Sequence, residues 1–277
     1  MFHAWVGAVG HARPGTCFLT QPMSKPQSPA PIPLLSDTLK LFLLAMVLAN
    51  VAGQMYGSLL PLYLTNLNAD IAQVGLFFTL SRIFPLLLQI LGGWISDSLG
   101  RLRSIALGSL AGVLSYAGLI LAPSWQWVLI GEGLGAITRS LIGPSFSAFI
   151  AEQSAQELRA RVFGISQFIF GIVGVVGPPL GGWLVGAYGF KVMLLCAAGL
   201  YTAAAIIRVH MARTATRTGR EAAEKLAWSG LFDNMGAILG MMTAGGIFTW
   251  IVVTDGISDI SLSLSLDLLP VYMKDIG

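Results

Sequence analysis

Long apolar stretches recur along this chain and are separated by short polar breaks. A helix of about 20 mostly apolar residues is needed to cross the core of a lipid bilayer. Runs of this kind predict seven membrane-spanning helices, at 39–64, 71–95, 104–122, 127–150, 162–186, 190–211 and, as a longer final segment, within 232–273. The pattern therefore predicts an all-α integral membrane protein built as a helical bundle.

The composition agrees with this prediction. Of the 277 residues, 55% are hydrophobic and only 10% are charged, whereas a soluble domain carries roughly a quarter charged residues. So few charges cannot cover the surface of a water-soluble protein of this length, which excludes a soluble enzyme, a nucleic-acid-binding protein and a disordered scaffold. The two cysteines, Cys17 and Cys196, provide no disulfide framework.

The basic residues predict which loops face the cytoplasm. Twelve of the sixteen Lys and Arg residues lie before the first span or at the ends of the second, fourth and sixth spans, with Arg208 counted among the last group. Membrane loops rich in Lys and Arg are retained in the cytoplasm. We therefore expect a multi-pass protein of the plasma or inner membrane with a cytoplasmic N-terminus.

A short motif occurs twice, because 59–64 reads LLPLYL and 268–273 reads LLPVYM. Transporters are commonly built from internal repeats, so the final segment is expected to begin a second copy of the first six helices. The chain then corresponds to one half of a transporter plus a seventh helix, apparently truncated, with about five further spans expected in a complete protein.

Four parts follow from these observations. They are a Pro-rich N-terminus without expected regular structure (1–35), a six-helix half (36–211), a basic cytoplasmic linker (212–230) and the start of the second half (231–277). The final apolar segment is longer than one ordinary crossing. Its helix is expected either to project into the cytoplasm or to be broken around Thr254-Asp255-Gly256.

The loop after the second span reads Gly93-x3-Asp97-x2-Gly100-Arg101-x-Arg103. Gly93 is expected to let two helix backbones approach closely, and Gly100 to permit a sharp turn. Asp97 places a carboxylate near the start of the next helix, where unpaired N–H groups favour negative charge. Arg101 and Arg103 can pair with acidic groups or lipid phosphates, and the alternative is a generic positive loop.

This spacing resembles the signature loop of the major facilitator superfamily, although that family usually has a basic residue where Ser98 stands here. The resemblance implies two six-helix halves that rock about a central site. It also implies that Asp97, Arg101 and Arg103 gate the conformational change and do not contact the solute.

A second loop, Glu152-x6-Arg159-Ala160-Arg161, resembles the acidic-then-basic loop that the superfamily repeats between the fourth and fifth spans. It predicts a second cytoplasmic latch that mirrors the one at Asp97. The alternative is a solvated loop that merely contains charges.

The fifth span contains Gly177-Pro178-x2-Gly181-Gly182. A proline within a helix bends it, and glycines at this spacing form a flat stripe for a neighbouring helix. The motif resembles that of the drug:proton antiporter branch of the superfamily, which implies export in exchange for protons. A packing kink, which any transporter can contain, is the alternative.

Ionisable side chains within a membrane are costly and are candidates for function. Glu132 is the candidate for proton coupling, because a carboxyl group shielded from water can exchange protons near neutrality. The alternative is a structural ion pair with Arg82. Glu132 and Arg139 are two helical turns apart and are expected to pair with other helices and not with each other. The full set of candidate coupling or substrate residues is Asn50, Gln54, Arg82, Glu132, Arg139, Asp255 and Asp259.

Asn50, Gln54 and Tyr56 on the first span are expected to line a cavity, because the resemblance implies that the first helix borders the substrate path; a hydrogen bond between helices is the alternative role. Asn50 and Gln54 share a helix face, and Tyr56 is rotated away from it. Arg82 and Arg139 are alternatively expected to recognise an anionic substrate.

These features predict a secondary active transporter that moves a small solute by alternating access, with proton-coupled efflux favoured. The alternatives are uptake of a small organic solute, including an anionic one, and a non-transporting membrane sensor of the same fold. No cofactor, metal site, catalytic residue or nucleic-acid partner is expected. The expected partners are the solute, protons and the lipid bilayer, and the expected state is a monomer.

Overall fold

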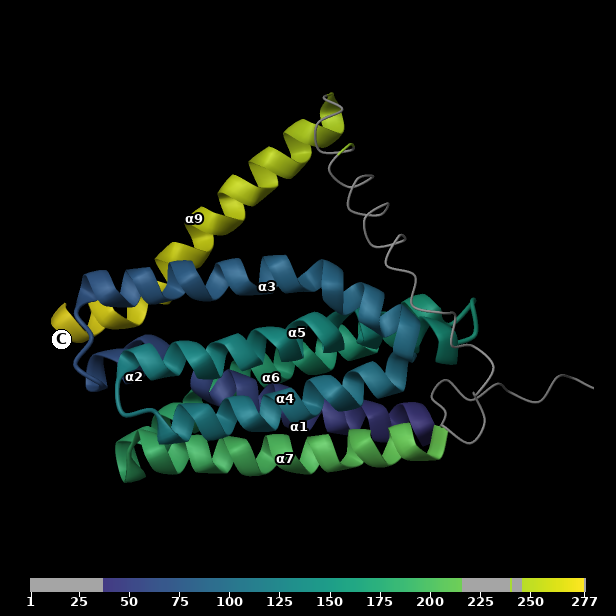
Figure 1. The fold of residues 1–277 in the computed structure, drawn as a ribbon, viewed down its shortest axis with the longest axis horizontal. Coiled ribbons are helices and arrows are strands. Elements are labelled where there is room, and N and C mark those ends of the chain that lie inside the picture. Colours follow the sequence, from purple (N-terminus) through teal and green to yellow (C-terminus); the bar gives the residue numbers. More distant parts are fainter. Residues whose placement is uncertain (1–36, 216–239, 241–245, 277) are drawn as a thin grey trace, which may run out of the picture. The chain divides into compact units, whose positions relative to one another are not determined.

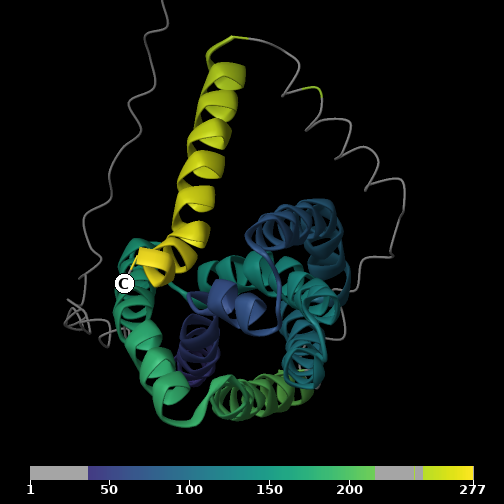
Figure 2. The same ribbon diagram turned by 90° about the vertical axis from the view of Figure 1, so that its left-hand side faces the viewer.

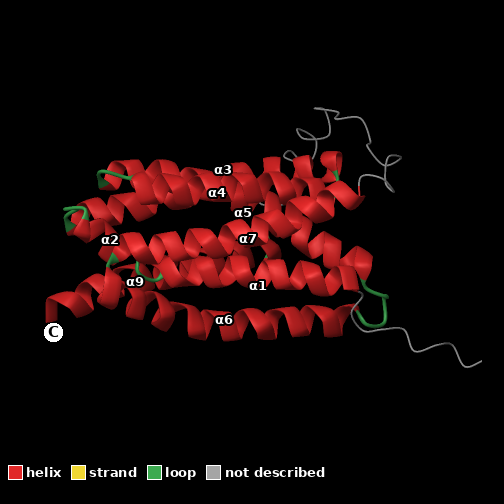
Figure 3. Ribbon diagram, turned by 90° about the horizontal axis from the view of Figure 1, so that it is seen from below, coloured by secondary structure: helices red, strands yellow, loops and turns green. Residues whose placement is uncertain are grey.

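The computed structural model describes residues 37–215, 240 and 246–276, and every regular element in these ranges is an α-helix (Figures 1 and 3). The predicted all-α architecture is therefore confirmed. The predictions for 1–35 and for most of 212–230 lie outside the described residues. The helices are α1 (Asp37–Gly57), α2 (Leu60–Asn66), α3 (Ile71–Leu99), α4 (Arg101–Leu121), α5 (Trp125–Gln153), α6 (Arg159–Tyr188), α7 (Phe190–Ala215) and α9 (Ile247–Ile276).

Five helices are long and apolar enough to cross a membrane, namely α1, α4, α5, α6 and most of α7. In α3 the described residues give a shorter apolar stretch, Ile71–Pro85, and α9 is not among the five. Length and apolarity thus support five of the seven predicted spans. The chain is a multi-pass membrane protein.

The first predicted span, 39–64, is two helices and not one. α1 ends at Gly57, and α2 begins at Leu60 with Pro61 in its first turn. Proline has no N–H, so Pro61 cannot donate the bond that would continue α1, but it fits the first turn of a new helix. The break therefore has a local cause that the hydrophobic pattern does not reveal.

The helices α1 and α3 to α7 pack as a bundle. α5 packs against α3 and α4, α7 packs against α1 and α4, and α6 packs against α1, as the view along the helices in Figure 2 shows. Large apolar side chains such as Leu114, Trp183 and Ile206 are exposed on the helices. Such exposure suits a surface that faces lipid.

Glycine sets the closest contact between α3 and α5. A Cβ atom at Gly92 would overlap the backbone carbonyl of Ser140, whereas a Cβ atom at Gly93 would meet open space. The prediction that Gly93 makes the close contact is therefore wrong. One residue along a helix is a rotation of about 100°, so the motif's glycine points away from the seam that its neighbour forms.

Glycine also sets the contact between α6 and α1. Cβ atoms at Gly177 and Gly181 would overlap Gln54 and Met55, whereas Gly182 borders open space. A spacing of four residues places Gly177 and Gly181 on one helix face. The predicted glycine stripe against a neighbouring helix is thus present at these two positions but does not include Gly182.

Two helices that were expected to be bent or broken are both continuous in the described residues. Pro178 lies inside α6, which remains one helix from Arg159 to Tyr188. The final segment is not broken around Thr254-Asp255-Gly256, because α9 runs through these residues without interruption. Residues 231–239 lie outside the described ranges, so the projection of this segment into the cytoplasm stays a prediction.

Candidate functional site

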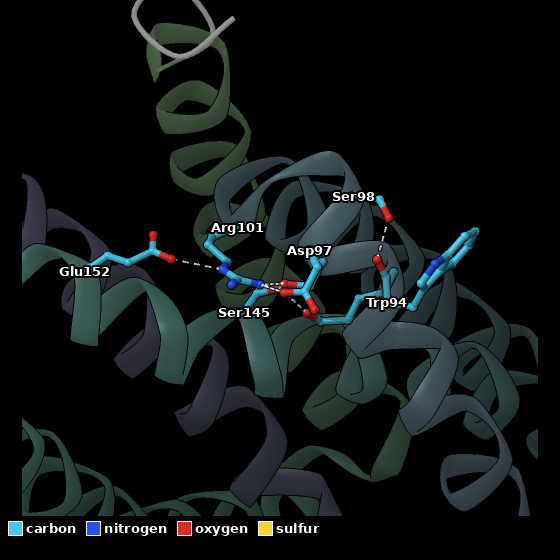
Figure 4. A network of polar contacts seen from close by, with 8 residues as sticks. Trp94, Asp97, Ser98, Arg101, Ser145 and Glu152 are labelled. Atoms are coloured by element: carbon cyan, nitrogen blue, oxygen red, sulfur yellow. Dashed lines mark hydrogen bonds and ion pairs between the residues drawn. The ribbon is translucent and has the colours of Figure 1, made fainter. Parts of the chain in front are cut away.

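Charged side chains gather where α3, α4 and α5 meet, and we call Asp97, Arg101 and Glu152 the helix-end cluster (Figure 4). Gly100 has a φ of +87° and joins α3 directly to α4. An L-residue with a side chain rarely adopts this conformation, so the predicted sharp turn at Gly100 is present. It places Arg101 one turn beyond Asp97.

Arg101 holds the helix-end cluster together. Its Nη1 donates to Asp97, and its Nε donates to Oε1 of Glu152 at 3.1 Å. Nη1 also donates to Oγ of Ser96 at 3.1 Å, and Ser145 on α5 donates to the same oxygen at 2.7 Å. One guanidinium therefore links the ends of three helices.

The two predicted latches share this centre. Glu152, predicted to belong to a separate second latch, lies at the end of α5 and pairs with Arg101. Arg159, Arg161 and Arg103 are exposed. The side chains of Asp97 and Glu152 are 68% and 55% exposed, so solvent screens these ion pairs.

A second charged group lies inside the bundle, and we call Tyr56, Glu132 and Arg139 the interior cluster. The Glu132 side chain is 7% exposed, and its Oε2 accepts from Nη2 of Arg139 at 3.1 Å. Its Oε1 accepts from the Tyr56 hydroxyl on α1. A buried carboxylate is thus held by one cation and one phenol.

The prediction that Glu132 and Arg139 do not pair with each other is therefore wrong. Seven residues span about 10 Å along a helix, but long side chains on a helix point back towards its N-terminus. Gly135 lies between the two residues, and a Cβ atom there would be 3.3 Å from Nη1 of Arg139. The absence of a side chain at Gly135 leaves room for the guanidinium.

A cavity of about 470 Å³ lies between α1, α4, α5 and α7. Asn50, Gln54 and Tyr56, the polar residues of the first span that were expected to line a cavity, all border it. The remaining lining residues are Met46, Ala49, Gly53, Gly112, Ser115, Tyr116, Gly135, Thr138, Arg139, Ile142, Gly143, Tyr201 and Arg208.

Arg208 is a cavity-lining cation that was not among the candidate site residues. The predicted span 190–211 contains it, but it was counted with the basic residues at the cytoplasmic end of that span, whereas it is only 1% exposed within α7. Its guanidinium donates to Oγ of Ser109 at 3.1 Å and to the carbonyl oxygen of Ala45 at 3.3 Å. The apolar neighbours Ile206-Ile207 and Val209 were the available signal that Arg208 lies within the bundle and not at its cytoplasmic edge.

The other candidates lie away from the cavity lining. Arg82 is exposed on α3, and the ion pair shown for Glu132 is with Arg139. Asp255 and Asp259 are exposed on α9. Their roles in coupling or substrate binding stay predictions. Among the described residues, no group of three His, Cys, Asp or Glu side chains is arranged to hold a metal ion.

Comparisons with known proteins agree with this architecture. The chain is 25% identical over 211 residues to a Na(+), Li(+), K(+)/H(+) antiporter of Planococcus maritimus, covering 73% of this chain and 49% of the antiporter. It is 22% identical over 125 residues to the quinolone resistance protein NorA of Staphylococcus aureus, covering 45% of this chain and 32% of NorA. The chain thus spans about half the length, or less, of these curated relatives.

A solved structure shares the fold. The peptide transporter POT, crystallised with alafosfalin, matches 77% of this chain with a TM-score of 0.55 and 15% identity, over 47% of its own chain. The family model of the Major Facilitator Superfamily matches residues 42–276. The chain therefore belongs to the major facilitator superfamily.

Proposed function

We propose that the protein is a secondary active transporter that exchanges a proton at Glu132 as it moves a small solute by alternating access. The observation that carries this proposal is the interior cluster, in which a buried carboxylate contacts Arg139 at the edge of the cavity. The proposal extends to a monomer in the cell membrane with a cytoplasmic N-terminus.

The coupling follows from charge balance. While Glu132 is ionised, its carboxylate holds the Arg139 guanidinium. Protonation removes the carboxylate charge, so Arg139 is released towards the cavity that it lines. Because the Arg139 guanidinium is free to contact a solute only when Glu132 is protonated, proton binding and solute binding each change the free energy of the other.

The helix-end cluster supplies the gate in this scheme. Arg101 joins the ends of α3 and α4 to the end of α5 through partly exposed ion pairs. Exposed pairs are worth about 0–1 kcal/mol each, so they can open and reform during each transport cycle at small cost. Asp97 and Glu152 therefore act on the rate of switching and not on solute affinity.

Export is the direction favoured by the α6 motif at Gly177–Gly182 and by the relatives named as a quinolone resistance protein and a cation/proton antiporter. Uptake of an organic anion with a proton is the second candidate. It is favoured by the two arginines, Arg139 and Arg208, that line the cavity.

Transport by everted membrane vesicles from cells expressing the chain tests the proposal, with a fluorescent quinolone as the probe. We expect Glu132→Gln to abolish the dependence of transport on the pH gradient. The matched control is Glu157→Gln, which removes an exposed carboxylate between α5 and α6 and should leave transport unchanged. Unaltered pH dependence in Glu132→Gln would remove Glu132 from the mechanism.

A further inference from the structure

Arg208 is a buried cation whose hydrogen-bond partners are all neutral. They are the hydroxyl of Ser109, the carbonyl oxygen of Ala45 and the sulfur of Met46. Its Nε is also buried and makes no hydrogen bond with any described residue. A buried charge is costly unless it is paired, so binding of an anion beside Arg208 would lower the free energy of the folded protein.

The two charged residues that line the cavity differ in this respect. Arg139 is paired with Glu132, which balances its charge, and the partners of Arg208 carry no negative charge. The cavity wall formed by the described residues therefore has a net positive charge. A cationic solute is repelled there, and an anionic solute is attracted.

The wall between the two arginines is aromatic. The Tyr56 and Tyr116 rings are 5.8 Å apart, and the Tyr116 and Tyr201 rings are 5.2 Å apart. The Cζ atom of Arg208 lies 5.9 Å from the centre of the Tyr201 ring. Tyr56, Tyr116 and Tyr201 are thus successive ring neighbours, and the last of them contacts Arg208. All three border the cavity, although Tyr116 and Tyr201 are each only 6% exposed, so an apolar or aromatic body can pack against the small ring area that faces the cavity.

We propose that Arg208 is the anion-binding residue of this cavity and that the cavity takes a small organic anion with an apolar or aromatic body. The donor that we assign to a carboxylate or a similar oxyanion is the Nε–H, which is buried and has no hydrogen-bond partner among the described residues, so the side chain must shift to expose it when the anion binds. The hydrogen bond that it then donates is charge-assisted. The solute body then lies along the tyrosine rings. This inference rests on the proposed function, because it takes the cavity as the solute's site.

Equilibrium binding to the purified chain in nanodiscs of zwitterionic lipid tests the inference without any variant. The probe is radiolabelled benzoate, and the competitors are benzoate, benzamide and benzylammonium, which share one ring and differ in charge. We expect benzamide and benzylammonium to compete at least about tenfold more weakly than benzoate, the equivalent of one lost charged contact. Equal competition by benzylammonium or benzamide would overturn the proposal.

Two variants locate the site. Arg208→Gln should weaken benzoate binding by about tenfold or more, and Arg208→Lys by less, because lysine keeps the charge but loses the planar fork. Arg213→Gln is the matched control, since Arg213 is exposed near the end of the same helix, and it should bind benzoate like the parent chain. Unchanged binding in Arg208→Gln would overturn the assignment, and the competition series decides the question if that variant does not fold.

The test is separate from that of the proposed function. Benzoate binding is measured at equilibrium with no gradient, whereas proton coupling is measured as transport in Glu132→Gln. Loss of coupling with intact, charge-selective benzoate binding would contradict the proposed role of Glu132 alone. Proton-coupled transport with no preference for the anion would contradict the role of Arg208 alone.

Discussion

An arginine is held by carboxylates at two places in this molecule, and the two places differ in their access to water. In the helix-end cluster the side chains of Asp97 and Glu152 are 68% and 55% exposed, whereas in the interior cluster Glu132 is 7% exposed. The same chemistry therefore has different energetics. An exposed pair breaks easily, as a gate requires, and a buried acid that loses its partner is strongly destabilised unless it takes up a proton.

The difference in exposure is the reason why we propose different roles for the two clusters. Water around Asp97 and Glu152 stabilises either carboxylate when its ion pair opens, so protonation of these groups would lower the free energy of the open state only slightly. Glu132 is only 7% exposed, and among the described residues its carboxylate accepts hydrogen bonds from Tyr56 and Arg139. The predictions below test this difference, from the largest expected effect to the smallest.

Among the substitutions considered, removal of the interior cluster's cation, Arg139, should lower the free energy of unfolding the most. Arg139→Gln leaves Glu132 buried and without its cation, and we expect the free energy of unfolding to fall by about 2–3 kcal/mol at neutral pH. This is below the full cost of breaking a buried pair because Arg139 itself is half exposed. Acidic pH should shrink the loss, since protonation removes the unpaired charge. Unfolding by SDS titration in mixed micelles measures the loss of unfolding free energy at neutral and at acidic pH. A loss of unfolding free energy that stays constant with pH would contradict the account.

A substitution in the contact between α3 and α5, the two helices that carry Asp97 and Glu152, should cause the next largest loss of unfolding free energy. Gly92→Ala forces a methyl group against the carbonyl of Ser140, and overpacking of this kind costs about 1–3 kcal/mol. Gly93→Ala, one residue away in open space, should be neutral or stabilising by up to about 1 kcal/mol. The same SDS titration compares the two, and equal effects would mean that no rigid seam supports the gate.

The helix-end cluster itself should affect rate more than stability. Asp97→Asn removes one exposed partner of Arg101, so we expect a change of less than about 1 kcal/mol in unfolding free energy. Transport turnover should slow severalfold while solute affinity is retained. Initial rates over a range of solute concentrations separate the two quantities, and a matching loss of affinity would argue against a gate.

The smallest expected effect is a difference between the two clusters in how salt changes the destabilisation caused by removing a carboxylate. The Debye length falls from about 30 Å at 0.01 M salt to about 8 Å at 0.15 M. The destabilisation caused by Glu152→Gln should therefore shrink by a few tenths of a kcal/mol over this range, a part of the small worth of an exposed pair. The destabilisation caused by Glu132→Gln should hold nearly constant. An equal salt dependence of both variants would show that the interior cluster is as hydrated as the helix ends.

Much of the fold could be predicted from the sequence because apolar runs and turns are local signals. The turn at Gly100 and the helix contacts of Gly177 and Gly181 followed from residue type and spacing. The break before Pro61 was missed, since a hydrophobic run looks the same whether its helix is continuous or interrupted.

The site was harder to predict because it depends on which side chains meet across helices. The pairing of Glu132 with Arg139 depends on the space left at Gly135, and that of Arg101 with Glu152 depends on how α4 meets α5. Arg208 was counted with the basic residues at the cytoplasmic end of its predicted span, 190–211, although its neighbours in the chain are apolar. Spacing along one helix does not contain this information.

Infrared spectroscopy of the purified chain tests most directly whether Glu132 takes up and releases the proton. The measured quantity is the carbonyl band of protonated carboxyl groups during an acid titration of the chain and of two variants, Glu132→Gln and Glu157→Gln. The account predicts that a band from a buried carboxyl group is present in the parent chain and in Glu157→Gln and is lost in Glu132→Gln. Identical titrations of all three would contradict it.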